Sequence, residues 1–348
     1  MKILHSIFSF NTGGAETMLV DIINQQCNTE SISLLIVNDK LNKSLLETID
    51  KRVDVFLIGR KESNKLQLFS TFWKIIAILN KIRPDVIHCH DNKLFPFFIG
   101  LRKKTYLTVH ALNLSCWFLK CYKQVFAISQ AVKDDLKKRA NVNAKLVYNG
   151  IAIDEYQQRM DYTHRQIFKI VQISRLDSQY KGQHIAIQAV AYLTEKYPDI
   201  NFTLSFIGDG EDKDKLKTLA VENNIENGII FLGQKSRLWI KNNLQEFDVL
   251  IQPSLNEGFG LTIIEGLAAG LPVIASNLDG PKEILDFLNV GLTIEAGNPN
   301  DLAEKILLVN KGFASGNLLN TNYLIKDKKR LDVFAIQTTA FNYIELYK

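Results

Sequence analysis

Two carboxylates, eight residues apart, are the residues of this sequence best suited to bind a polyhydroxylated ligand. Glu257 lies in a glycine-containing loop, and Glu265 follows in the first or second turn of an expected helix. A carboxylate accepts two hydrogen bonds from neighbouring hydroxyls, so Glu265 suits a ribose and Glu257 suits the hydroxyls of a sugar. Two alternatives remain open: Glu257 is a solvated loop residue, or Thr262-x-x-Glu265 is a capping box in which Glu265 binds the start of its own helix.

The backbone between the two carboxylates could bind a phosphate. Its amides lie at a helix start, where N–H groups lack partners within the helix and the helix dipole favours an anion. The residues concerned are Gly258, Phe259, Gly260, Leu261 and Thr262. Arg175 and Lys181 precede another expected helix, and a pyrophosphate between two such cations would fit that position. The alternative is that both are ordinary surface cations.

Short apolar runs alternate with helical segments along the chain, which predicts parallel, doubly wound α/β sheets. The runs at 249–251 and 273–275 enclose the loop of Glu257. Ligands of such sheets bind at the carboxyl ends of the strands. A length of 348 residues favours two domains. We expect the first at 1–150, completed by a helix at 332–348, and the second at 151–331.

A family resemblance rests on these motifs. Glu257-Gly-Phe-Gly-Leu, Glu265 and Gly270-x-Pro-Val resemble the E-x7-E signature of retaining glycosyltransferases of the family 4 type, which have the GT-B fold. Arg175-Leu176 to Lys181-Gly182 resembles the R-L-x3-K-G run of that family, with one additional residue. The resemblance implies two Rossmann-like domains facing a cleft, the first on the acceptor side and the second binding a nucleotide sugar, with the C-terminal helix crossing back to the first.

The resemblance also implies roles outside the E-x7-E segment. Gly13 and Gly14 resemble a GGAE-type loop that faces the donor diphosphate, and Gly233 would lie beside the nucleobase. His110 resembles the histidine of a T-V-H run that contacts the donor sugar, although Ala111 replaces the usual following acid. We therefore expect His110, Glu257, Arg175 and Lys181 to be catalytic.

No metal site is expected. His88 and His90 share one face of a strand, but no third ligand has a suggestive spacing. Asp212-x-Asp214 formally matches the metal motif of the other major glycosyltransferase fold. It lies in a charged helical run, where a solvated face is the simpler interpretation. Donor binding by cations and amides requires no cofactor besides the nucleotide-diphosphate sugar itself.

Charge is divided unevenly along the chain. Residues 1–150 hold 22 Lys and Arg against 12 Asp and Glu, a net +10, and residues 151–348 hold 20 against 25, a net −5. The basic half suggests an anionic neighbour. The basic and aromatic residues of 101–126 could dock on a lipid interface, or could form a helix with a core face and a wet face. Nucleic acid is not expected, because no recognition module accompanies the basic residues.

The cysteines and the hydropathy of the chain indicate where the protein is located. Four cysteines without framework spacing indicate a reducing compartment, and neither a secretory leader nor a spanning segment is visible. We expect a cytoplasmic protein, peripheral on the inner face of the plasma membrane.

The function implied is transfer, with retention, of a hexosyl or N-acetylhexosaminyl unit from a nucleotide-diphosphate sugar. A UDP-sugar is favoured over GDP-mannose, and the acceptor is expected to be lipid-linked or an oligosaccharide in bacterial cell-surface polysaccharide synthesis. Two alternatives are a nucleotide-sugar epimerase of the same fold and an inactive nucleotide-sugar-binding subunit. No nucleophile is assigned, because the family is interpreted as using front-face attack.

Overall fold

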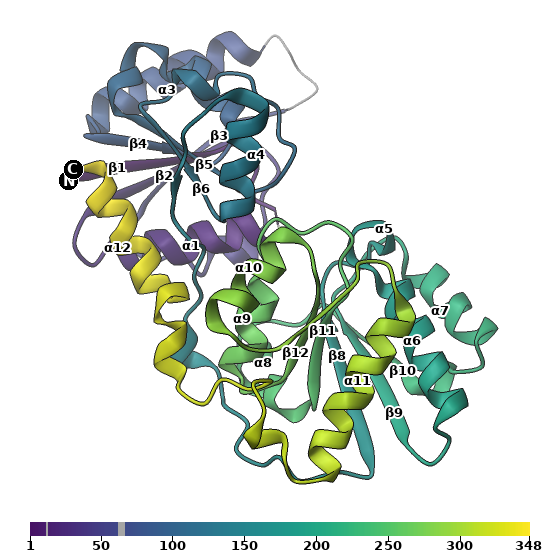
Figure 1. Ribbon diagram of the computed structural model, residues 1–348. Coiled ribbons are helices and arrows are strands. Elements are labelled where there is room, and N and C mark those ends of the chain that lie inside the picture. The colour runs from purple at the N-terminus through teal and green to yellow at the C-terminus, as the bar shows by residue number, and fades with distance from the viewer. Residues whose placement is uncertain (12, 62–66) are drawn as a thin grey trace. The chain divides into compact units, whose positions relative to one another are not determined.

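The computed structural model describes residues 1–11, 13–61 and 67–348. The chain divides into two compact units, which we describe separately. The first unit comprises Met1–Ile151 with Val333–Lys348, and the second comprises Ala152–Asp332. Each unit is built on one sheet of parallel strands covered by helices (Figure 1). The expected doubly wound α/β architecture is therefore confirmed.

The first unit contains a seven-stranded parallel sheet in the order β3-β2-β1-β4-β5-β6-β7. Its central strands are almost wholly buried runs of aliphatic residues, as sheets covered on both faces require. The strands are β1 (Lys2–Ile7), β2 (Ser31–Asn38), β3 (Asp54–Arg60), β4 (Val86–Cys89), β5 (Thr105–Val109), β6 (Gln124–Ala127) and β7 (Lys145–Leu146). The first strand ends at Ile7, and Phe10 forms an isolated bridge with Leu41.

Helices connect these strands. They are α1 (Gly14–Gln26), α2 (Lys43–Leu46), α3 (Gln67–Ile82), α4 (Gln130–Ala140) and α12 (Ile336–Tyr347), with the 3-10 segments η1 (Asn92–Lys104) and η2 (Leu119–Cys121). The helix expected at 332–348 begins later, at Ile336. A 3-10 segment, η7 (Lys328–Phe334), precedes it.

The C-terminal helix belongs to the first unit. Ile151 donates its N–H to the carbonyl of Phe334 and accepts from the N–H of Ile336, both at 2.9 Å, which joins the chain's return to the end of the first sheet. Tyr343 and Tyr347 of α12 are buried against the sheet. The residues nearest the C-terminus therefore complete the core that the first 151 residues begin.

The second unit contains a six-stranded parallel sheet in the order β10-β9-β8-β11-β12-β13. Its strands are β8 (Ile167–Ile173), β9 (Asn201–Ile207), β10 (Ile229–Gly233), β11 (Val249–Gln252), β12 (Val273–Ser276) and β13 (Leu292–Ile294). Its helices are α5 (Ser178–Lys181), α6 (Gln183–Lys196), α7 (Lys213–Glu222), α8 (Arg237–Asn243), α9 (Leu261–Ala268), α10 (Asp279–Leu288) and α11 (Pro299–Ala314), with η3 (Ile153–Glu155), η4 (Glu226–Gly228), η5 (Leu244–Glu246) and η6 (Leu318–Asn320). The order reverses between β8 and β11, which places their carboxyl ends at the switch point of the sheet.

None of the helices described here is long and apolar enough to cross a membrane.

Candidate functional site

The loops after β8 and β11 meet at the carboxyl edge of the second sheet. Gly182, between α5 and α6, has a φ of +67°, and a Cβ there would lie 1.9 Å from the carbonyl oxygen of Pro253. Only glycine allows both the backbone conformation and this approach. The first loop carries the predicted cations and the second carries Glu257, so the contact holds the two predicted parts of the site together.

Lys181 and Glu257 form an ion pair. Nζ of Lys181 lies 2.8 Å from Oε2 of Glu257, and both side chains are largely buried, with 26% and 18% exposed. Nε2 of Gln252, the last residue of β11, donates to the same carboxylate oxygen at 3.0 Å. The additional residue in the R-L-x4-K-G run does not keep Lys181 from the Glu257 loop, because α5 is a single turn that ends at Lys181 and aims its side chain there. Glu257 is therefore an oriented carboxylate, and the solvated-loop alternative is wrong.

Arg175 has a different environment. Its guanidinium donates to Oδ2 of Asp177 at 2.6 Å, and its side chain is 72% exposed. With Tyr180 and Lys215 it lines a cavity of about 580 Å³ beside the loop after β9. The two predicted cations thus have separate partners: Lys181 binds Glu257, and Arg175 binds Asp177.

Glu265 lies in the second turn of α9, where its Oε1 accepts a hydrogen bond from the hydroxyl of Tyr156 at 2.9 Å. The helix is N-capped by Gly260, whose φ is +114°, so Thr262 lies inside the helix instead of at the capping position. The capping-box alternative is therefore wrong. Tyr156 is buried and holds one oxygen of the carboxylate in place.

The start of α9 has the features expected of an anion site. Its N-cap is a glycine, so no side chain caps the first turn. A Cβ on Gly280, at the start of α10, would lie 2.6 Å from the carbonyl carbon of Gly258. The Gly258–Phe259 backbone is thus packed directly against α10. The loop is fixed by this packing, as a preorganised phosphate site requires.

Gly233, predicted beside a nucleobase, ends β10 with a φ of +69° and accepts a hydrogen bond from the N–H of Gly208. Gly208 follows β9 and contacts the loop of β8, where a Cβ would lie 2.0 Å from the carbonyl oxygen of Ser174. The carboxyl ends of β8, β9 and β10 are therefore linked by close backbone contacts. Gly233 lies at the same edge of the sheet as the ion pair.

The predicted glycines of the first unit lie at the start of α1. Gly13 is the N-cap and provides no side-chain cap, and Gly14 is the first helical residue. A Cβ on Gly14 would meet no atom within 4 Å, whereas one on Gly13 would lie 2.5 Å from the carboxylate of Glu16. Burial raises the pKa of Glu16. The space beside Gly14, at the start of α1, is therefore not filled by other described residues.

His110 follows β5 at the carboxyl edge of the first sheet. Its Nε2 lies 3.0 Å from Nδ1 of His90, which follows the neighbouring strand β4. Burial lowers the pKa of His110 to about 4 and lowers that of His90 well below its usual value. His110 is therefore neutral near pH 7.

Three buried histidines come close enough to suggest a metal, but their nitrogens are engaged. Ligand atoms of His5, His88 and His90 lie within 4.8 Å of one another. His88 bonds Thr108 and the hydroxyl of Tyr347 through its two nitrogens. His5 and His90 likewise use both nitrogens, in contacts with Gln26 and neighbouring histidines at 2.8–3.0 Å. His5 is thus a third histidine beside His88 and His90, which the spacing did not predict, and each nitrogen of the three rings has a hydrogen-bonding partner.

Asp212 and Asp214 do not form a shared carboxylate site. Asp212 accepts from both the N–H and the hydroxyl of Ser178, which lowers its pKa and fixes the start of α5. The side chain of Asp214 is 94% exposed and lies 3.4 Å from Lys217. The predicted solvated face describes Asp214, whereas Asp212 is held by Ser178.

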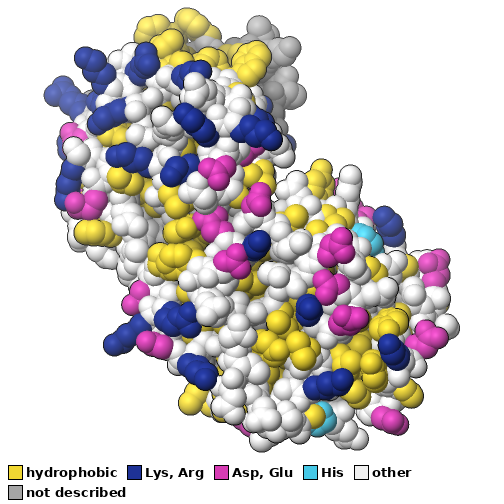
Figure 2. Space-filling view, in the orientation of Figure 1, with side chains coloured by type: hydrophobic (Ala, Val, Ile, Leu, Met, Phe, Trp, Pro, Cys, Tyr) yellow, Lys and Arg dark blue, Asp and Glu magenta, His cyan; other side chains and the backbone are white. Residues whose placement is uncertain are grey.

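The basic and aromatic stretch 101–126 is not a helix, so that alternative is wrong. It contains the end of η1, then β5, a loop, η2 and the start of β6. Tyr122 is buried in the core, whereas Trp117 is 72% exposed and Lys120 is exposed. Lys and Arg side chains crowd the visible face of this unit (Figure 2). The stretch therefore presents two exposed aromatic residues, Trp117 and Phe118, together with exposed Lys and Arg side chains.

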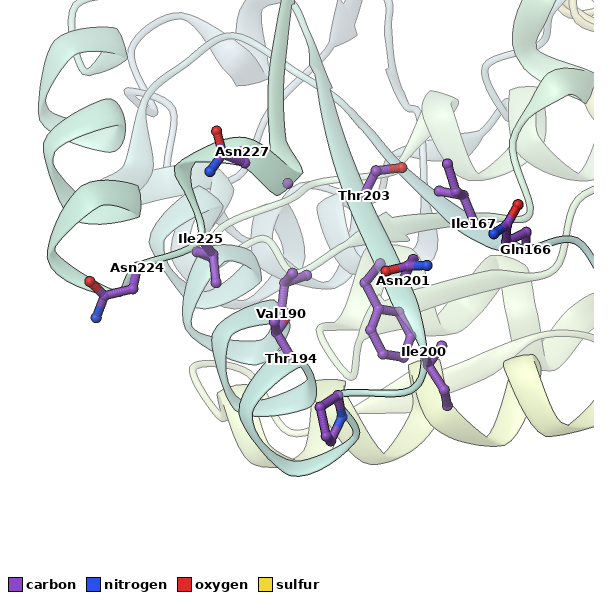
Figure 3. A pocket seen from close by; sticks show the side chains of 13 residues that line it. Gln166, Ile167, Val190, Thr194, Ile200, Asn201, Thr203, Asn224, Ile225 and Asn227 are labelled. Atoms are coloured by element: carbon purple, nitrogen blue, oxygen red, sulfur yellow. The ribbon is translucent and has the colours of Figure 1, made fainter.

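A second cavity, of about 520 Å³, lies at the other end of the second sheet. Figure 3 shows it lined by Ile167, Val190, Asn201, Thr203 and Asn227 among others, around the beginnings of β8 and β9. Its lining contains no charged side chain. The chemistry of the second unit is concentrated at the opposite, carboxyl edge.

Four supporting residues were not predicted from the sequence: Tyr156, Gln252, His5 and Gln26. Tyr156 lies 109 residues from Glu265, and no spacing connects them. Gln252 could have been inferred, because it ends a buried strand five residues before Glu257. His5 could also have been suspected, since it occupies a central strand of buried aliphatic residues.

Comparisons with known proteins agree with this geometry. The family model for glycosyl transferases group 1 matches residues 163–312, and the model for Glycosyltransferase Family 4 matches residues 12–155. An uncharacterized glycosyltransferase of Haemophilus influenzae is 31% identical over 328 residues, covering 86% of this chain and 88% of the relative. Lipopolysaccharide 1,6-galactosyltransferase of Escherichia coli K12 is 23% identical over 323 residues, covering 87% and 86%.

Some relatives are longer than the region they share with this chain. An uncharacterized glycosyltransferase of Methanocaldococcus jannaschii is 32% identical over 185 residues, which is 53% of this chain and 48% of the relative. Among solved structures, Anabaena HepE in complex with UDP has a TM-score of 0.81 at 23% identity, covering 99% of each chain. The same protein has also been solved with UDP-glucose. The GT-B fold expected from the resemblance is confirmed.

Proposed function

Since the chain belongs to the glycosyltransferases of group 1 and family 4, we propose that it transfers a hexosyl or N-acetylhexosaminyl unit from a nucleotide-diphosphate sugar with retention of configuration. The favoured donor is a UDP-sugar, and GDP-mannose is the second donor to test. The acceptor is lipid-linked or an oligosaccharide of a bacterial cell surface. The Lys181–Glu257 ion pair, at the same sheet edge as the start of α9, is the observation that carries the proposal.

The donor is assigned by chemistry at that edge. Glu265, held by Tyr156, accepts hydrogen bonds from the ribose, and Gly233 lies beside the base. The diphosphate is bound by the amides of the α9 start, with Gly13 and Gly14 as a further backbone surface. Complexes of HepE with UDP and with UDP-glucose support this donor class.

Glu257 and Lys181 perform different parts of the transfer. Glu257 binds hydroxyls of the departing sugar, and Lys181, already at 2.8 Å from that carboxylate, neutralises the charge that develops on the leaving diphosphate. Arg175 adds a second cation when it leaves its exposed contact with Asp177. His110 contacts the transferred sugar. Attack occurs on the front face with help from the leaving phosphate, so no side-chain nucleophile is assigned.

Cell-surface polysaccharide synthesis is proposed from the relatives together with the surface of the first unit. One relative is named as a lipopolysaccharide galactosyltransferase, and two others as Protein CapJ and an amylovoran biosynthesis glycosyltransferase. A lipid-linked acceptor explains the basic surface around Trp117, which would hold the enzyme peripherally on the inner face of the plasma membrane.

The experiment is a donor screen by calorimetry over UDP-, GDP- and ADP-sugars, followed by transfer to candidate acceptors with and without EDTA. We expect one nucleotide class to bind, and transfer that persists in EDTA because phosphate is held by cations and amides. Donor turnover without acceptor, giving an epimer, would identify an epimerase instead. Donor binding with neither transfer nor hydrolysis would identify an inactive subunit. Loss of transfer in EDTA and rescue by manganese would overturn metal independence.

A further inference from the structure

A row of three imidazoles crosses the first sheet at adjacent strands. His5 lies on β1, His90 follows β4 and His110 follows β5, and these strands are neighbours in the sheet. Nδ1 of His5 lies 3.0 Å from Nε2 of His90, and Nδ1 of His90 lies 3.0 Å from Nε2 of His110. Nε2 of His5 lies 2.8 Å from Oε1 of Gln26 on α1. We call these three rings, with Gln26, the histidine relay.

The proton positions in the relay follow from its end at Gln26. Nε2 of Gln26 faces the carbonyl oxygen of Ala340 at 3.5 Å, so its amide oxygen is the atom that faces His5. An amide oxygen accepts hydrogen bonds and cannot donate, so His5 carries its proton on Nε2. Its Nδ1 must then accept from Nε2–H of His90.

The same reasoning fixes His110. Since Nε2 of His90 is protonated, its Nδ1 accepts from Nε2–H of His110. The remaining nitrogen, Nδ1 of His110, therefore presents a lone pair. It is buried and has no hydrogen-bond partner among the residues that the structure describes. Buried polar atoms are seldom left unpaired in native proteins, so a hydrogen-bond donor supplied by a bound molecule would satisfy this acceptor.

The contacts of the relay keep His5 and His90 neutral. A proton added to Nδ1 of either ring would place two N–H groups against each other, and Gln26 cannot take up a proton at the far end. Burial lowers the pKa of His5 and of His110 to about 4. Within the described part of the chain, the ring of His88 on β4 packs against His5 and His90, and Tyr343 and Tyr347 of α12 pack in turn against His88, which bonds Tyr347. The relay fixes a tautomer and does not conduct protons.

We propose that the relay positions His110 as a neutral hydrogen-bond acceptor for a hydroxyl of the transferred sugar, with His5, His90 and Gln26 as its positioning residues. This inference rests on the proposed function for the identity of the ligand. The tautomer of His110 does not depend on the ligand, because it is set by contacts inside the first unit. It can therefore be tested on the protein without ligand. The lone pair on Nδ1 of His110 accepts a hydrogen bond from a hydroxyl and repels an anionic group. We therefore expect the enzyme to prefer a donor whose sugar has a hydroxyl at this position.

The tautomer can be read directly by NMR of the full chain with 15N-labelled histidine. Long-range correlations should show His110 with an unprotonated Nδ1 and a protonated Nε2, unchanged between pH 8 and pH 5.5. Signals are assigned by single substitution of the six histidines, and exposed His164 serves as the solvent-exposed reference. A protonated Nδ1 on His110, or its titration within that range, would overturn the relay.

The positioning role is tested with His90→Phe against His88→Phe as a matched control, since both replace a buried ring of β4 or its end. His90→Phe should abolish the single tautomer of His110 and lower kcat about 10- to 100-fold, with Kd for UDP unchanged. His88→Phe should preserve the His110 tautomer. Equal tautomer populations and equal kcat in the two variants would contradict the proposal, and if His90→Phe does not fold, the wild-type spectrum still decides the relay.

Ligand titration separates this inference from the proposed function. UDP-glucose should shift the His110 Nδ1 signal, and UDP alone should not. If UDP-glucose and the other nucleotide sugars of the donor screen fail to bind while the tautomer is as predicted, the proposed function is wrong and the relay stands. If UDP-glucose binds and is transferred but the Nδ1 signal is unmoved, the contact with the sugar is wrong.

Discussion

Glu265 is the residue whose role is most sharply defined by its neighbours. Its carboxylate is bound by Tyr156 on one oxygen, and its helix is capped by Gly260 instead of by Glu265 itself. Removing it should therefore affect a ligand more than the helix. Tyr156→Phe removes only the hydroxyl that holds this carboxylate, so its effect on ligand binding should be smaller than that of removing Glu265.

We expect Glu265→Ala to weaken binding of free UDP by about 1.5–3 kcal/mol, because a charged hydrogen-bond acceptor for the ribose is lost. Calorimetric titration with UDP measures this. Tyr156→Phe should give a smaller loss in the same direction. Unchanged UDP affinity in Glu265→Ala, with a lowered free energy of unfolding, would show that the carboxylate has a structural role.

Glu257→Gln should behave differently, because the partner of Glu257 is proposed to be the sugar. Binding of UDP should be retained, whereas binding of the UDP-sugar and kcat should fall, with kcat lower by about 10²-fold. The variant keeps the size of the side chain and removes the charge that faces Lys181 at 2.8 Å. An equal loss of affinity for UDP and for UDP-sugar would contradict the assignment.

At the scale of elements, the junction of α5 and α6 decides whether Lys181 reaches Glu257. Gly182→Ala should destabilise the protein by about 3 kcal/mol, since its Cβ would overlap the carbonyl oxygen of Pro253 and its φ is positive. Displacement of α5 should also reduce transfer. Gly100→Ala is the control, because a Cβ there meets no atom within 4 Å. Equal denaturant midpoints for the two variants would refute the packing argument.

The histidines on β1 and β4, and those that directly follow β4 and β5, make the first unit sensitive to acid. Folding lowers the pKa of His110 from 6.5 to about 4, so the unfolded state binds protons first as the pH falls. This contribution to stability is complete above pH about 6.5 and is lost as the pH falls toward 4, at ~1.4 kcal/mol per pH unit for each proton. Urea unfolding at pH 7.5 and pH 5 measures the loss. His90→Phe, with one titrating ring fewer, should lose less stability over that interval, and an identical loss would argue against the shift.

At the scale of the whole molecule, the division of charge predicts binding to anionic membranes. The protein should sediment with anionic vesicles at low salt and stay in solution with neutral vesicles, because a Lys or Arg near an anionic surface contributes ~1 kcal/mol. High salt should release it, since the Debye length falls to ~3 Å at 1 M.

Variants locate the surface responsible. Lys103→Glu with Lys120→Glu should abolish sedimentation, and Trp117→Ser should weaken it, since these side chains are exposed. Lys104 is a weaker choice for reversal because it donates to the carbonyl of Pro84 at 2.6 Å. Lys311→Glu with Lys326→Glu in the second unit is the charge-matched control, because both of these lysines are exposed. If sedimentation with vesicles changes neither with salt nor with these substitutions, the basic surface has no role in membrane binding.

The sequence determined the local elements and the chemistry at their ends. Alternating apolar runs and glycine-marked loops predicted the two parallel sheets, because buried strands and helix starts follow from patterns within a few residues. Glu257, Glu265, Lys181 and the start of α9 could be located in the same way. Their types and spacing already indicated a nucleotide sugar.

The tertiary structure decided which residues orient these groups. The contacts of Tyr156 with Glu265 and of Gln26 with His5 join positions far apart in the chain, and no periodic pattern encodes such a pair. The helix expected at 332–348 was assigned to the first domain beforehand, but only the structure shows that Tyr343 and Tyr347 are its residues buried in that core. The separation of Arg175 from Lys181 was also decided there, because a single turn of helix aims one cation at Glu257 and leaves the other with Asp177. The orientation of a side chain depends on its contacts with neighbouring strands and helices. Which strands are neighbours depends on pairing between distant segments, so the sequence of a single strand does not determine it.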